Sequence, residues 1–350
     1  MQRNFGLDIM RSVSILLVLL QHIGFYIPGL APLRLGGVGV EVFFVLSGFL
    51  IGGILFKEIH KGNNLFQTLK SFWIRRWFRI LPLYYAVLLF KFIVLDNSIG
   101  WNIFYYVFFL QNNFYGVQFL DVSWSLVIEE WFYLFSPFYI FFSVRILKSQ
   151  AKIIASLICF ILAVLVLRTL YVEISNVPYV GVNGNFPFRF DSLFLGVLLS
   201  FLNFHKHKAF AKLNSGGVFV LGLLLFIGYL FAFIKFSNYV DEIKIFRTLG
   251  FLLLPLTISL MVPYISSLTI NSDKNILNKY TVLVFTKTSI LTYAMYLSHP
   301  FVNAYLDGTK VAESLLLKSI CSLTLTFLMA WLIYTYFERP ILNLRDKIQN

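Results

Sequence analysis

The stretch "RSVSILLVLLQH", residues 11–22, is apolar enough to lie in lipid, yet it begins with Arg11 and ends with His22. An ionisable side chain inside a membrane helix costs about 2.5–3.5 kcal/mol on insertion scales, so by default it faces the bundle interior and is a candidate for function. The alternative is a buried structural pair, or a side chain near a helix end that reaches the headgroups. These two residues are separated by nearly three helical turns, about 16 Å along the axis. They therefore share one helix face, and the stretch predicts a membrane span with a functional polar face.

The composition of the whole chain agrees with this interpretation. Of its 350 residues, 59% are hydrophobic and 13% are charged, and the mean hydropathy is +0.79. A soluble domain carries about 25% charged residues. Apolar runs long enough to cross a bilayer cover residues 6–28, 37–57, 79–96, 122–144, 153–172, 188–204, 214–235, 247–265, 284–305 and 314–337. We therefore expect an all-α, polytopic bundle of about ten transmembrane helices that forms a single membrane domain over residues 1–350.

The net charge of +13 reflects topology rather than nucleic-acid binding. Connections on the side of the N-terminus carry most of the cations, whereas the connection 97–121 on the other side has no Lys or Arg. This asymmetry follows the positive-inside rule and predicts that both termini are cytoplasmic. No cluster of metal-ligand type is evident, because Cys159 and Cys321 each lie alone inside an apolar run. We expect no metal.

The polar residues of the predicted spans fall at two depths. The outer group contains His22, Glu41, Glu129, Arg189, Asp191 and His299, and the inner group contains Arg11, Arg76 and Arg79. Asp8, three residues before Arg11, is expected to pair with it. Such an arrangement suits a site that takes an anionic, phosphate-bearing donor from the cytosol and acts on a molecule outside.

Two features carry open alternatives. In "FWIRRWFRILPLYY", residues 72–85, the cluster Arg75, Arg76 and Arg79 either fixes topology at the headgroups or grips a phosphate through forked hydrogen bonds. The glycines that flank Glu41 in "GGVGVEVFFVLSGFLIGG" favour close helix packing, which does not explain the carboxylate itself. Glu338, with Arg339 and Pro340, is expected to end the last span.

Seven stretches, in order along the chain, resemble the acyltransferase family 3 membrane proteins. They are "LDIMRSVSILLVLLQH", "GVEVFFVLSGFLIG", "RRWFRILPLYY", "WSLVIEEWFY", "RFDSLFLGVLLS", "YLSHP" and "ERP". The resemblance implies a multi-pass protein of the bacterial plasma membrane. It implies transfer of an acyl group, most often acetyl from acetyl-coenzyme A, to an extracytoplasmic glycan.

The resemblance also implies roles for particular residues. Arg11 and His22 match the family's Arg and His pattern and are implied to be needed for transfer, with Glu129 in the matching Trp-Ser-Leu-x-x-Glu pattern. Arg76 and Arg79, with Arg75 beside them, would hold the phosphates of the donor. The residues assigned to the acceptor are Trp124, Glu41, Arg189, Asp191 and His299. Some members carry an esterase-like domain, and because this chain stops at Asn350 we expect its membrane domain to deliver the acyl group itself.

The expected mechanism has the thioester beside His22, which acts as general base on a sugar hydroxyl. Glu129 would orient His22, as a carboxylate does in hydrolytic triads, and a covalent acyl-histidine is a variant of this route. The main alternative is a transporter or flippase whose buried ionisable residues relay protons or bind substrate. A membrane glycan polymerase is a further alternative. Only the acyltransferase needs an acyl thioester.

Overall fold

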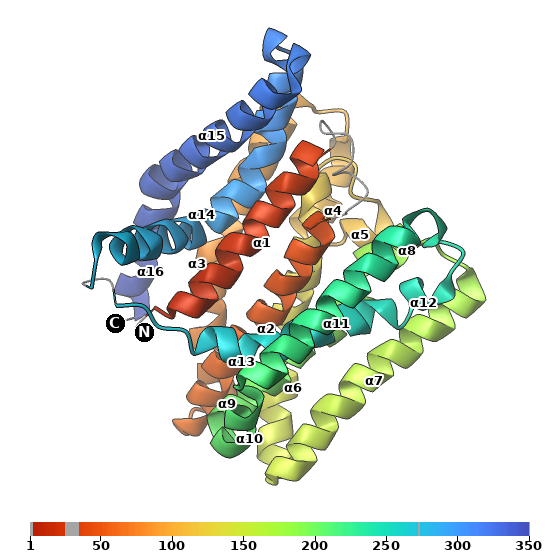
Figure 1. The fold of residues 1–350 in the computed structure, drawn as a ribbon, viewed down its shortest axis with the longest axis vertical. Coiled ribbons are helices and arrows are strands. Elements are labelled where there is room, and N and C mark those ends of the chain that lie inside the picture. The colour runs from red at the N-terminus through yellow and green to blue at the C-terminus, as the bar shows by residue number, and fades with distance from the viewer. Residues whose placement is uncertain (1–2, 25–34, 272–273, 350) are drawn as a thin grey trace. The chain divides into compact units, whose positions relative to one another are not determined.

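The computed structural model describes residues 3–24, 35–271 and 274–349, and within these ranges the chain is helical and contains no strand (Figure 1). A long helix lies at each predicted apolar run: α1 (Phe5–Gly24), α2 (Leu35–His60), α3 (Leu65–Phe90), α6 (Trp124–Leu147), α7 (Gln150–Ser175), α9 (Phe190–His205), α11 (Gly216–Lys235), α13 (Gly250–Ser266), α14 (Ile276–Asp307) and α15 (Leu315–Ile333). The all-α prediction is therefore confirmed for the described residues. The predicted end of the first span, 25–28, lies outside them.

Short helical segments join or extend these helices. They are η2 (Lys91–Leu95), η3 (Gly100–Asn102), α4 (Ile103–Val107), α5 (Gln111–Phe114), η4 (Asp121–Ser123), α8 (Tyr179–Gly184), η5 (Phe186–Arg189), α10 (His207–Leu213), η6 (Ser237–Tyr239), α12 (Lys244–Arg247), η7 (Lys310–Glu313), η8 (Tyr334–Glu338) and α16 (Arg339–Gln349). In the described part of the chain, 7 helices are long and apolar enough to cross a membrane, and α13 is a shorter apolar helix. The chain is thus a multi-pass membrane protein, while the count of about ten spans and the cytoplasmic termini stay predictions.

Two helices continue beyond the predicted ends of their spans, and where the membrane surface crosses them stays a prediction. Helix α3 begins at Leu65 rather than at residue 79, so Arg75, Arg76 and Arg79 lie well inside a helix and not at its entry. At the other end of the chain Glu338 does not end the last helix, because the π-helical turn η8 leads directly into α16. A π-helical turn of this kind occurs frequently at functional sites.

The chain divides into two compact units, which are described separately. Unit 1 comprises Met1–Val40, Ile74–Ile103 and Leu268–Asn350, and unit 2 comprises Glu41–Trp73 and Phe104–Ser267. In unit 1, α14 packs against both α1 and α15. In unit 2, α9 packs against α7 and α13, and α13 packs against α11. The prediction of a single domain over the whole chain stays a prediction.

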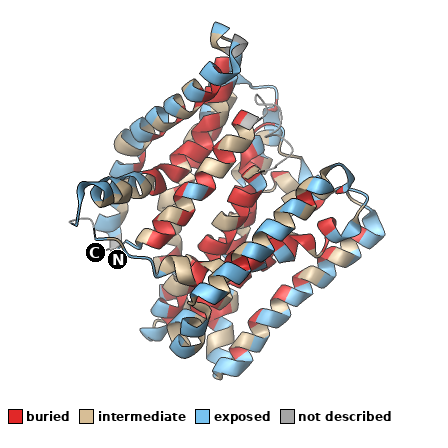
Figure 2. Cartoon of the chain, in the orientation of Figure 1, coloured by how far each residue is buried: buried red, intermediate tan, exposed pale blue. Residues whose placement is uncertain are grey.

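Burial within unit 2 distinguishes inner from outer helices. Along Phe186–His205, which includes α9, 67% of the apolar core segment is buried, whereas in α11 the share is 11%, and Figure 2 shows exposed and half-buried residues along α11 with few buried ones. The exposed side chains of α11 include Leu224, Ile227 and Phe231. A continuous apolar surface of this kind would aggregate in water, and it is the surface that lipid tails cover in a bilayer.

Glycines allow α2 and α9 to approach closely in unit 2. A Cβ atom on Gly48 would overlap the backbone carbonyl of Leu193, and a Cβ atom on Gly196 would overlap the carbonyl of Val45. Small residues at such crossings let two helix backbones meet. The expectation that the glycines of this segment serve close packing is confirmed.

Gly48→Ala should therefore destabilise the protein by about 1–3 kcal/mol, the usual cost of overpacking, because backbone rather than a movable side chain lies in the way. Thermal unfolding of the detergent-purified protein measures this. Gly228→Ala is the matched control, since Gly228 lies inside α11 and a Cβ there meets no heavy atom within 4 Å. Equal melting temperatures for the two variants would contradict the assignment.

Candidate functional site

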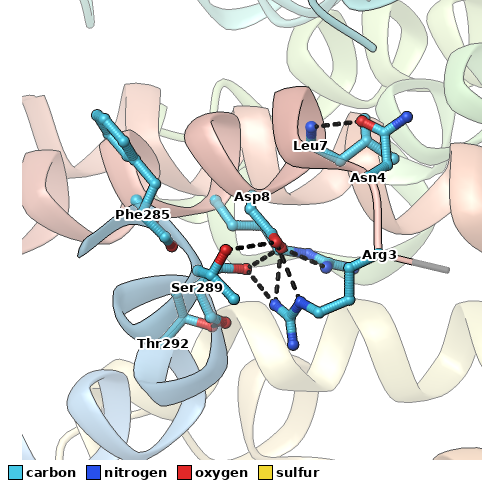
Figure 3. A network of polar contacts seen from close by, with 10 residues as sticks. Arg3, Asn4, Leu7, Asp8, Phe285, Ser289 and Thr292 are labelled. Atoms are coloured by element: carbon cyan, nitrogen blue, oxygen red, sulfur yellow. Dashed lines mark hydrogen bonds and ion pairs between the residues drawn. The ribbon is translucent and has the colours of Figure 1, made fainter. Parts of the chain in front are cut away.

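A buried carboxylate in the first turn of α1, that of Asp8, connects this helix to the middle of α14 in unit 1 (Figure 3). Asp8 is 2% exposed and accepts hydrogen bonds from Arg3 Nη2 at 2.7 Å and from Ser289 Oγ at 2.7 Å. Arg11 Nη1 lies 3.9 Å from the same carboxylate, so the predicted pairing of Asp8 with Arg11 is confirmed. Asp8 also accepts a hydrogen bond from Arg3 Nε at 3.0 Å. The same carboxylate therefore contacts two arginines and Ser289 of α14.

The same pair of helices brings two histidines together at a second level. The rings of His22 on α1 and His299 on α14 have centroids 4.6 Å apart and meet edge to face at 66°. Contacts at Asp8 with Ser289 and at His22 with His299 show that α1 and α14 run in the same direction. Parallel direction agrees with the predicted topology, in which both helices cross from the cytoplasmic side outward.

The hydrogen bond of His299 defines which of its nitrogens is available. His299 is fully buried, and its Nδ1 lies 3.1 Å from the carbonyl oxygen of Met295. A carbonyl oxygen only accepts, so Nδ1 carries the proton and Nε2 of the neutral ring is an acceptor. Among the described residues Nε2 has no hydrogen-bond partner. It is therefore available to a proton donor such as the neighbouring imidazole.

Arginines gather at the other depth of unit 1. The charges of Arg76 and Arg79 act on Arg11, and those of Arg3 and Arg76 act on Arg79. Two carboxylates face this group, Asp8 on Arg11 and Glu338 on Arg79. Arg3, Arg11, Arg76 and Arg79 therefore lie close enough for their charges to act on one another. Arg75, also in the predicted donor set, is half-buried on the same helix.

Glu338 lies in the π-helical turn η8, and its charge acts on Arg79 of the arginine group. It is 5% exposed, and the described residues provide no hydrogen bond to its Oε1. The turn η8 places it as the last residue before α16. We interpret Glu338 as the buried counter-charge of Arg79 rather than as the end of a span.

Unit 2 holds a second set of predicted residues in buried ion pairs. Arg189 pairs with Glu41, and the two side chains are 1% and 5% exposed. Asp191 pairs with Arg168 at 2.8 Å, and both are fully buried. Arg189 also donates to Asn183 Oδ1. The structure therefore places Glu41, Arg189 and Asp191 in one charge network, and their predicted contact with the acceptor stays a prediction.

Arg168 is absent from the predicted site residues although the sequence contains its signal. It is an arginine inside the apolar run 153–172, and the cost of a charge in a span marks it as readily as it marks Arg11. The sequence does not show which residue pairs with Arg168, because its partner Asp191 lies on a different helix, α9.

Glu129 is held by a hydroxyl on each side within unit 2. Ser47 Oγ donates to its Oε1 at 3.0 Å, and Tyr133 Oη donates to its Oε2 at 2.8 Å. Trp124, one turn earlier on α6, meets the Phe44 ring edge to face at 6.2 Å. The predicted pairing of Glu129 with His22 joins residues of the two units and stays a prediction.

Comparison with known proteins identifies the family. The model of the acyltransferase domain family, acyltransferase 3, matches residues 4–335. The chain belongs to this family. The resemblance found in its motifs is thereby confirmed over nearly the whole sequence.

Curated relatives of this acyltransferase family member are longer proteins. The peptidoglycan O-acetyltransferase OatA of Listeria monocytogenes is 27% identical over 368 residues, which cover 96% of this chain and 55% of that protein. A putative O-acetyltransferase of Staphylococcus aureus is 28% identical, with 96% and 56% covered. The putative peptidoglycan O-acetyltransferase YrhL of Bacillus subtilis is 24% identical, with 96% and 54% covered. The chain thus spans about half the length of these relatives, and no solved structure matches it significantly.

Proposed function

We propose that this acyltransferase moves an acetyl group from cytosolic acetyl-coenzyme A to a hydroxyl of an extracytoplasmic cell-wall glycan, in the bacterial plasma membrane. The contact of His22 with His299 carries the proposal, because it supplies a base with a positioned acceptor beside it. The names of the relatives, which are peptidoglycan O-acetyltransferases, support peptidoglycan as the class of acceptor.

In the proposed step His22 removes the proton of the sugar hydroxyl as its oxygen attacks the thioester carbonyl. The carbon–oxygen bond forms, the carbon–sulfur bond breaks, and the departing thiolate takes the proton from the imidazolium. His299 acts through His22: its Nε2, which has no hydrogen-bond partner among the described residues, would accept a hydrogen bond from the ring of His22 and so select the tautomer whose other nitrogen is the base. Glu129 is proposed to stabilise the imidazolium from unit 2.

The arginine cluster of unit 1 supports a phosphate-bearing donor. Arg76 and Arg79 are one helical turn apart on α3, and Arg79 has Glu338 as a counter-charge. Guanidinium groups bind phosphate through paired hydrogen bonds. With the donor bound, its phosphates would form ion pairs with these guanidinium groups.

Arg76→Gln and Arg79→Gln should each raise the KM for acetyl-coenzyme A by about tenfold or more, because a hydrogen bond to a charged group contributes about 1.5–3 kcal/mol, while kcat changes less. Initial rates at varied donor concentration give both constants. Lys70→Gln, an exposed cation earlier on the same helix, is the control. An unchanged KM in both arginine variants would leave these residues as topology signals.

Release of free thiol from acetyl-coenzyme A by the purified protein tests the function as a whole. The assay compares a panel of glycan acceptors that includes soluble peptidoglycan fragments with a no-acceptor control. We expect thiol release that depends on an acceptor. A protein that neither releases thiol nor binds the donor would favour a transporter instead.

A further inference from the structure

A pocket of about 340 Å³ lies in unit 2, and none of the residues proposed for catalysis lines it. The ends of α2, α6 and α9 enclose it, together with the turn that follows α2. Its lining is Phe56, Ile59, His60, Gly62, Val144, Arg145, Lys148 and His205. All four polar side chains in this lining are basic, and none is acidic. Arg145 and Lys148 are the cations of this lining and the two histidines can donate hydrogen bonds, so the pocket can receive an anion.

The basic side chains are held in place around this volume. Arg145 donates from Nη2 to the carbonyl oxygen of Asn63 at 3.1 Å and lies over the Phe141 ring at 5.4 Å. His205 stacks on Phe201 with ring centroids 4.4 Å apart, and His60 lies 6.2 Å from His205. A guanidinium group carries five N–H donors, so Arg145 can bind a ligand while it keeps its bond to Asn63. The pocket is therefore organised before any ligand binds.

Glu58, an acidic residue near the end of α2, forms its hydrogen bonds outside the lining. Glu58 is buried and accepts hydrogen bonds from Lys61 Nζ at 2.9 Å and Asn63 Nδ2 at 2.9 Å. It shapes the turn after α2 and does not line the pocket. The cations of the lining are thus not neutralised by a carboxylate that shares the pocket with them.

Helix stability alone does not explain this grouping. Cations at a helix C-terminus interact favourably with the helix dipole, which accounts for each basic residue singly. It does not account for their convergence on one open volume. Lys148 adds a second observation, because its φ of 53° lies in the left-handed region where glycine is the favoured residue at a helix end. Lysine at this position therefore has a conformational cost that glycine would not have.

The surroundings identify the class of anion. Phe142 and Ile146, which are 46% and 69% exposed, flank Arg145 on the outward face of α6. The pocket therefore lies at the edge of an exposed apolar surface, where Arg145 and Lys148 follow the apolar residues of α6. The positive-inside rule predicts that this end of α6 is cytoplasmic. Basic pockets between membrane helices on this side bind the headgroups of anionic lipids. We propose that this pocket binds the phosphate of an anionic phospholipid from the inner leaflet.

Native mass spectrometry of the detergent-purified chain tests the proposal. Phosphatidylglycerol is titrated against phosphatidylcholine of the same acyl chains. We expect the wild type to retain phosphatidylglycerol selectively, and Arg145→Gln/Lys148→Gly to lower its association constant by about thirtyfold, the effect of two surface cations. Phosphatidylcholine binding should not change.

Matched variants separate lost binding from lost structure. Lys148→Gly replaces a strained residue with the one that its backbone favours, so its melting temperature should equal or exceed that of the wild type while lipid binding falls. Lys152→Gln removes an exposed cation of α7 that does not line the pocket and should leave binding unchanged. Equal phosphatidylglycerol binding by the wild type and the double variant would overturn the proposal. So would displacement of the lipid by equimolar inorganic pyrophosphate, which would assign the pocket to a free phosphate ligand.

Discussion

His22→Ala is expected to lower the rate of acetyl transfer by about 10²–10⁴-fold, the contribution of a positioned general base. The imidazole is the group that meets His299 at 4.6 Å between centroids, and alanine has no nitrogen to accept the proton of the hydroxyl. The measurement is thiol release with a glycan acceptor. Insertion and thermal unfolding should match the wild type, because His22 is only half-buried.

Two further variants make the result specific. Val13→Ala changes an exposed apolar side chain on the same helix and should retain activity. His299→Gln should lower kcat while the KM for the donor stays within about twofold, because a residue that positions the base affects the chemical step and not uniform binding. A His22→Ala protein with normal transfer would remove the histidine from the mechanism and leave the pair as a packing contact.

Arg168→Met is expected to cost about 3–5 kcal/mol of stability, the penalty for leaving one partner of a buried ion pair without the other. Both side chains of the pair are fully buried, so Asp191 would remain as a charge without its closest partner. Arg168→Met/Asp191→Leu should recover most of the loss, since it removes both charges at once. Thermal unfolding in detergent across the double-mutant cycle measures the coupling.

The exposed pair of Lys244 with Glu173 provides the control for this cycle. Its side chains are 55% and 48% exposed, and exposed ion pairs contribute about 0–1 kcal/mol. Lys244→Met should therefore leave the melting temperature nearly unchanged. If Arg168→Met were equally harmless, the pair would not hold α7 to α9.

The motifs predicted much of the site because polar residues in lipid are conspicuous. His22, Arg11 and His299 each interrupt an apolar run, and the energetic cost of doing so marks them without any knowledge of the fold. The same reasoning would have found Arg168. It did not locate the start of α3, because residues 65–78 are amphipathic rather than apolar, and a hydropathy pattern places the boundary where the apolar run begins.

By itself the sequence determined that the chain is an all-helical membrane protein, which family it belongs to, and which polar side chains are candidates for function. These properties depend on the composition and on the spacing of residues along the chain, and both can be read from the amino-acid sequence without a structure. Only the tertiary structure decided the partners: His22 with His299, Glu41 with Arg189, and Asp191 with Arg168. Each pair joins different elements of the chain, and helical periodicity gives the direction of a side chain around its own axis but not which helix packs against that face.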